Sequence, residues 1–145
     1  MVLVDVNLLV HAVNADSPDH AAAQAWLDNL LQGTGPVALP WAVLTGFVRI
    51  TTHPRLLPHP LPLDEALKIM NQWLALPSVT VPLPSVRHAQ EFETACRGVS
   101  AKGNLVTDAH LAALATEHGA SLASCDADFS KFPGLRWFNP LHSPR

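Results

Sequence analysis

The sequence begins with four apolar residues that are followed at once by a carboxylate, Asp5, in the stretch MVLVDVNLLV. A run this short predicts a strand over residues 1–4 that is covered on both faces, as in a parallel sheet. A charge is costly in such a setting unless it has a partner or the strand ends there. Asp5 therefore marks the carboxyl end of a buried strand, and open α/β sheets bind their ligands at that edge.

Short apolar runs alternate with helical segments along the rest of the 145 residues. This alternation predicts an α/β fold with a central, mostly parallel sheet, and the length suits a single domain over residues 1–145. The predicted strands are 1–4, 36–40, 78–84, 121–126 and 135–140. The predicted helices are 18–32 with Ser17 as N-cap, 41–53, 64–74, 86–97, and 108–118 with Thr107 as N-cap.

Four of the twelve acidic residues do not fit a solvated helix surface. Asp5 ends the first strand, and Asp108 begins a helix. Asp126 and Asp128 follow the strand that starts at residue 121. Because the carboxyl ends of parallel strands meet at one edge of a sheet, these four side chains are expected to converge. The other eight are expected in water, at helix ends or on polar helix faces: Asp16, Asp19, Asp28, Asp64, Glu65, Glu91, Glu93 and Glu117.

A cluster of carboxylates raises the pKa values of its own members and is costly unless a cation compensates it. Mg²⁺ and Mn²⁺ prefer oxygen ligands of this kind, and such an ion promotes the attack of water on a phosphodiester. Taken singly, each acid also has a structural explanation. Asp108 can stabilise a helix N-terminus, and Asp126 and Asp128 can form a turn. The four together favour a metal-dependent phosphodiesterase.

The net charge of −3 argues against nucleic-acid binding through phosphate neutralisation alone.

Two cysteines are too few for a disulfide scaffold, and no stretch resembles a secretory signal or a membrane-spanning helix. The protein is therefore expected in the cytoplasm, with no membrane partner. The eight histidines show no paired metal-ligand spacing, and His88 and His110 are expected at surfaces or in loops.

Three stretches carry a family likeness: VDVNLLV, FVRITTHPRL and NLVTDAHLAALATEHGASLASCDADFSKFPGLRWFNPL. They resemble the PIN-domain ribonucleases and, more narrowly, the VapC-type toxins of bacterial toxin–antitoxin pairs. The resemblance implies a three-layer α/β/α fold and a toxin that hydrolyses RNA with Mg²⁺ or Mn²⁺. It implies metal ligands at Asp5, Asp108 and Asp126. Asp128 would belong to the same catalytic group, and Asn7 would orient Asp5. A cognate antitoxin and a homodimer are implied as partners.

The sequence departs from this family at position 46. The family usually carries Glu three residues before the Arg of its middle helix, and counting back from Arg49 gives Gly46. The alternative function is therefore a non-catalytic PIN-like module that binds RNA or a protein. A phosphatase of the haloacid dehalogenase type fits less well, because it needs a second Asp where this chain has Asn7.

Overall fold

The computed structural model describes residues 1–142, in which six α-helices and one 3₁₀-helix alternate with five short strands. The strands are β1 (Val2–Val4), β2 (Val37–Ala38), β3 (Val79–Thr80), β4 (Ser121–Ala123) and β5 (Trp137–Phe138). The helices are α1 (Val6–Val13), α2 (His20–Gln32), α3 (Trp41–Thr51), α4 (Leu63–Leu74), α5 (His88–Val99), α6 (Asn104–Glu117) and the 3₁₀-helix η1 (Ala127–Lys131). None of these helices is long and apolar enough to cross a membrane.

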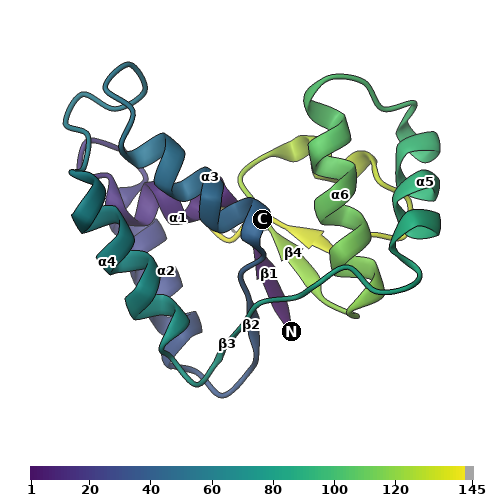
Figure 1. The fold of residues 1–145 in the computed structure, drawn as a ribbon, viewed down its shortest axis with the longest axis horizontal. Coiled ribbons are helices and arrows are strands. Elements are labelled where there is room, and N and C mark those ends of the chain that lie inside the picture. The colour runs from purple at the N-terminus through teal and green to yellow at the C-terminus, as the bar shows by residue number, and fades with distance from the viewer. Residues whose placement is uncertain (143–145) are drawn as a thin grey trace.

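The five strands form one sheet in the order β3-β2-β1-β4-β5, and every neighbouring pair is parallel. Figure 1 shows α1 to α4 on one side of this sheet and α5 and α6 on the other. The predicted three-layer α/β/α fold with a parallel sheet is thus confirmed. The strand order reverses between β1 and β4, so a crevice is expected where these two strands end.

The core lies on both faces of the central strands. Leu3 and Val4 of β1, like Val37 of β2 and Leu122 of β4, are at most 1% exposed. Burial on both faces explains why these strands are continuous apolar runs rather than alternating ones. The strands are shorter than predicted, partly because prolines without an N–H group flank β2 and β3.

The predicted N-cap of α2 is wrong. The helix begins at His20, and Asp19 occupies its N-cap position. The Ser17 hydroxyl instead accepts a hydrogen bond from Asp19 N–H at 3.1 Å and lies 2.7 Å from Nδ1 of His11. Ser17 therefore stabilises the turn between α1 and α2 rather than the helix itself. The predicted end of this helix is confirmed, since Gly33 is its C-cap.

Candidate metal centre

Asp5 lies at the junction of β1 and α1, a helix that was absent from the predicted elements. The backbone N–H of Asp5 donates to the carbonyl of Ala123 at 2.9 Å, which continues the pairing of β1 with β4. Its carboxylate Oδ1 accepts a hydrogen bond from Val6 N–H at 2.7 Å and so caps α1. The residue is 6% exposed. Asp5 therefore ends a buried strand, as predicted, and begins a helix at the same point.

Asn7 and Ser124 hold the second carboxylate oxygen of Asp5. Asn7 Nδ2 donates to Asp5 Oδ2 at 3.1 Å, and the Ser124 hydroxyl donates to the same oxygen at 2.7 Å. Ser124 is fully buried and also accepts a hydrogen bond from Asp126 N–H at 2.9 Å. One hydroxyl thus connects the end of β1 to the loop after β4. Asn7 orients Asp5 as predicted, whereas Ser124 was missed, and its only signal is a polar residue directly after an apolar strand.

Asp108 reaches this region from the second turn of α6, not from the first turn as predicted. The helix begins at Asn104 because Gly103, with a φ of 60°, turns the chain into the helix earlier. Thr107 is therefore an interior residue of α6 and not its N-cap. Since the helix dipole acts mainly within the first turn, stabilisation of a helix terminus does not explain Asp108.

Asp108, Asp126 and Asp128 each bring a carboxylate oxygen to within 4.8 Å of the others. Asp126 caps η1 by accepting a hydrogen bond from Asp128 N–H at 2.9 Å. Asp128 also forms an ion pair with Lys131 Nζ at 2.8 Å, which compensates part of its charge. Asp5 lines the same cleft, and its charge acts on Asp108. The structure thus brings the four predicted acids together, with three of them at metal-binding distance from one another.

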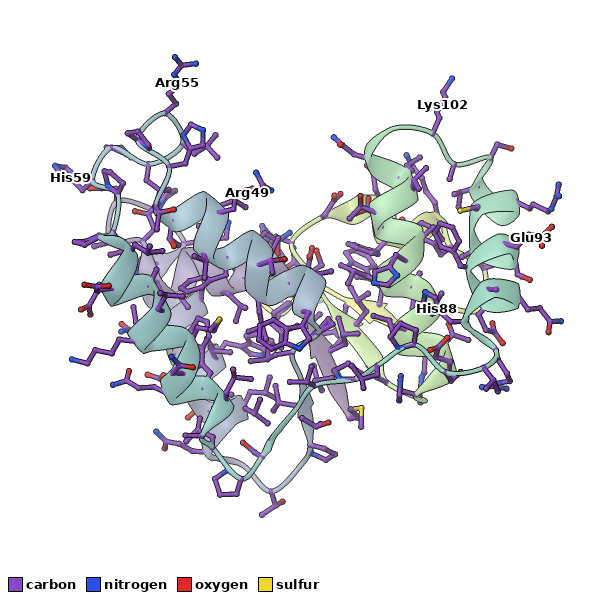
Figure 2. The ribbon with its side chains drawn as sticks, in the orientation of Figure 1. Arg49, Arg55, His59, His88, Glu93 and Lys102 are labelled. Atoms are coloured by element: carbon purple, nitrogen blue, oxygen red, sulfur yellow. The ribbon has the colours of Figure 1, made fainter. Side chains whose placement is uncertain are left out.

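The opposite wall of the cleft is formed by α3. Gly46 and Arg49 line it, and Figure 2 shows the Arg49 side chain extending from α3. Within residues 1–142 Arg49 has no ion-pair partner. A Cβ atom at Gly46 would lie 3.3 Å from Cγ2 of Val6, because α3 and α1 approach each other closely there. The cleft therefore combines a cluster of anions with one cation that is available to a ligand.

Burial and mutual repulsion raise the pKa values of two of these acids. Burial is the largest cause for Asp108, and the charges of Asp126, Asp5 and Asp128 add to it, which raises the pKa of Asp108 to about 6. Burial also raises the pKa of Asp5, although hydrogen bonds from Ser124 and Val6 oppose it. A cation placed among these oxygens would relieve the repulsion. Carboxylate oxygens are the ligands that Mg²⁺ and Mn²⁺ prefer, so this donor set fits such an ion.

Comparison with known proteins identifies one family. Residues 2–135 match the family described as the PIN domain. Ribonuclease VapC37 from Mycobacterium tuberculosis (strain ATCC 25618 / H37Rv) is 45% identical over 140 residues, which make up 97% of this chain and 97% of that protein. The likeness therefore extends over nearly the whole of both chains.

Solved structures share the fold. The structure of FitAB bound to an IR36 DNA fragment has a TM-score of 0.73 at 21% identity and covers 100% of this chain and 99% of that one. VapBC2 from Rickettsia felis, bound to a DNA fragment from their promoter, has a TM-score of 0.70 at 16% identity, with 96% and 98% covered. At these identities the likeness concerns the fold alone.

Proposed function

The chain belongs to the PIN domain family, and from this premise we propose that it is a metal-dependent endoribonuclease that acts as the toxin of a toxin–antitoxin pair. The likeness to VapC ribonucleases that the sequence motifs indicated is confirmed by the relative at 45% identity. The proposal assigns metal binding to Asp5, Asp108 and Asp126 with Mg²⁺ or Mn²⁺. Asp128 completes the catalytic group.

One observation carries the proposal: four carboxylates from three distant parts of the chain line a single cleft. Acids that serve only the fold are normally paired with cations or exposed to water. Among residues 1–142, Asp128 is the only one of the four that forms an ion pair. Burial, together with repulsion from the neighbouring carboxylates, raises the pKa of Asp108 to about 6. An arrangement that destabilises the protein without a cation is best explained by the binding of one.

Each side chain has a distinct task in this proposal. Asp108 and Asp126 would hold the ion. Asp5 would be a further metal ligand, and hydrogen bonds from Ser124 and Asn7 hold its carboxylate in place. When bound, the ion supplies positive charge for a phosphate group and lowers the pKa of a water molecule. Arg49, which lines the cleft, would bind a neighbouring phosphate of the substrate. This local positive charge would help to hold RNA on a chain whose net charge is −3.

RNA and an antitoxin are the proposed partners. The relative VapC37 is a ribonuclease by name, which supports RNA as the substrate. VapBC2 is described as bound to a DNA fragment from their promoter, which supports a complex with an antitoxin here. We propose that the tail of this antitoxin covers the acidic cleft. A homodimer and a cytoplasmic location complete the proposal.

The purified protein should cut a pool of RNA only when Mg²⁺ or Mn²⁺ is present. EDTA should stop the cleavage and excess Mn²⁺ should restore it, because the acids alone repel a phosphate. Gel electrophoresis of the products measures the reaction. The Asp108→Asn protein, purified in the same way, is the negative control. RNA that binds in a mobility-shift assay but stays intact with either ion would instead favour the non-catalytic module.

The Gly46→Glu variant should bind Mn²⁺ about tenfold more tightly than the wild type, because it adds a charged oxygen ligand to the cleft. Gly46→Gln is the matched control, since it brings the same contact with Val6 but no charge. Calorimetric titration compares the three proteins. Equal affinities of the Glu and Gln variants would mean that a side chain at position 46 does not reach the ion.

A further inference from the structure

A second cluster of ligand atoms lies outside the acidic cleft, where α5 and α6 face each other (Figure 2). His88 of α5 places its Nε2 atom 3.0 Å from Nδ1 of His110 on α6. His88 Nδ1 lies 2.9 Å from the Glu117 carboxylate. These residues were expected separately in water, at surfaces or at a helix end. The structure instead joins them in one chain of contacts, Glu117–His88–His110.

The Glu117 carboxylate determines which nitrogen of His88 carries the proton. A carboxylate only accepts hydrogen bonds, so the proton of a neutral His88 ring lies on Nδ1 and the lone pair lies on Nε2. Glu117 is itself fixed, because its Oε1 accepts a hydrogen bond from Ser85 N–H at 2.8 Å and its side chain has no exposed surface. The ring of His88 also stacks on Phe92 at an interplanar angle of 13°. His88 is thus held as a metal-ligating histidine is held, with a carboxylate behind the imidazole.

We propose that His88 Nε2 and His110 Nδ1 form a two-histidine chelate for a divalent transition metal such as Ni²⁺ or Cu²⁺. The observed contact needs one proton between the two nitrogens. That proton belongs to Nδ1 of His110, since His88 carries its own on Nδ1; when an ion binds, the His110 proton moves to Nε2 by exchange with water, which frees the lone pair of Nδ1 for the ion. Imidazole nitrogens suit nickel, copper and zinc, whereas Mg²⁺ and Mn²⁺ prefer the carboxylates of the other site.

The separation of the two nitrogens is short enough for both of them to bind one ion. With metal–nitrogen bonds of about 2.05 Å, two ligands at a right angle lie about 2.9 Å apart, and two at a tetrahedral angle lie about 3.3 Å apart. The observed 3.0 Å is the length of the hydrogen bond between the two rings and lies between these two values, so both nitrogens can reach one ion after a small movement. Right angles occur in square-planar and octahedral coordination, which Cu²⁺ and Ni²⁺ adopt. The remaining positions would be filled by water from the open hollow beside the pair, which Phe92, Val106 and Thr107 line.

Binding at this pair would cross-link two consecutive helices, α5 and α6, that pack against each other. His88 is on α5, and His110 follows Asp108 by two residues on α6. An ion that binds only the folded chain adds to its stability by mass action. We therefore expect Ni²⁺ to raise the melting temperature even when excess Mg²⁺ fills the acidic cleft. The site does not depend on the proposed nuclease function, and either can fail without the other.

Calorimetric titration of the untagged full chain with NiCl₂, in excess Mg²⁺, tests the proposal. The wild type should bind one Ni²⁺ at the pair, and His110→Gln should weaken that binding by at least about tenfold. His88→Gln should act in the same way, and Glu117→Gln should cause a smaller loss because Gln still accepts the hydrogen bond from His88. His118→Gln is the matched control on the same helix end, since Nε2 of His118 is already bonded to the Leu83 carbonyl.

A second measurement keeps the test decisive if a variant folds poorly. The wild type with one equivalent of Cu²⁺ should give an electron paramagnetic resonance spectrum with hyperfine structure from two imidazole nitrogens. The melting temperature should rise with Ni²⁺ in the wild type and in His118→Gln, but not in His110→Gln. A folded His110→Gln protein that binds Ni²⁺ as tightly as the wild type would overturn the proposal. A copper spectrum with one nitrogen ligand would overturn it as well.

Discussion

Replacing Asp108 by Asn should lower metal-dependent RNA cleavage by more than about 100-fold, because changes in the groups that merely support metal ligands already cost about 10–100-fold. The folded structure should survive this change. In the part of the chain that the structure describes, burial and neighbouring charges act on the Asp108 carboxylate, and no hydrogen bond to it contributes. The substitution therefore removes a charge and a ligand without leaving a buried donor unpaired.

Asp28→Asn is the matched control for this experiment. Asp28 is an exposed carboxylate on α2, outside the acidic cleft. Initial rates with saturating Mn²⁺ should be measured for the wild type and both variants, with circular dichroism to check folding. Cleavage at the wild-type rate by a folded Asp108→Asn protein would remove Asp108 from the mechanism. The same loss in Asp28→Asn would point to a general effect of charge.

Asp5 is a poorer probe of the same mechanism. Its two carboxylate oxygens accept hydrogen bonds from Val6 N–H, Asn7 Nδ2 and the Ser124 hydroxyl. The amide of Asn has only one oxygen, so Asp5→Asn turns its NH₂ group toward at least one of these donors. A buried donor without an acceptor costs about 1–3 kcal/mol. Loss of activity in this variant would therefore mix a metal effect with a folding effect.

The fold class and the position of Asp5 were predictable from local sequence. A short apolar run followed by a carboxylate describes a buried strand that ends at a ligand-binding edge, and β1 ends there. The alternation of strand and helix patterns also predicted the parallel sheet. Both inferences depend only on residues that are neighbours in the sequence. The roles of Asp5, Asp108 and Asp126 as metal ligands, and of Asp128 in the catalytic group, stay predictions.

Other features depend on backbone conformation and on packing. Thr107 before Asp108 looked like a helix N-cap, but the left-handed backbone at Gly103 starts α6 four residues earlier, at Asn104. The helix α1 was missed because Asp5 serves both the strand and the helix. The contact of His88 with His110 joins residues 22 positions apart on two packed helices. No spacing rule within one helix predicts such a pair.

The Asp126→Asn variant should be more stable than the wild type in EDTA, by about 1 kcal/mol at neutral pH. Among the neighbouring charges, that of Asp126 contributes most to the raised pKa of Asp108. The substitution removes this repulsion but keeps an oxygen that can accept the hydrogen bond from Asp128 N–H. Asn caps a helix about as well as Asp, so the turn into η1 should be preserved.

The gain from Asp126→Asn should depend on pH. The pKa of Asp108 is about 6 in the folded protein, above its ordinary value of 3.8. A group with a raised pKa stabilises the fold while it is protonated, and this contribution is lost as the pH rises through the folded value. Removal of the Asp126 charge lowers the pKa of Asp108 in the folded protein toward its ordinary value. The variant therefore loses less stability than the wild type as the pH rises. The difference in the free energy of unfolding between Asp126→Asn and the wild type should therefore be small near pH 4.5 and should reach its full size near pH 7.

Metal should reverse the order of the two proteins. Mn²⁺ at 100 times its dissociation constant adds about 2.7 kcal/mol to the stability of the wild type. Asp126→Asn has lost a ligand and gains less at the same concentration, so it should become the less stable protein. Urea unfolding of both proteins, in EDTA and in Mn²⁺ at two pH values, measures these effects. If Asp126→Asn is destabilised by the same amount in EDTA and in Mn²⁺, Asp126 serves only the turn, and the convergence of the carboxylates has no part in metal binding there.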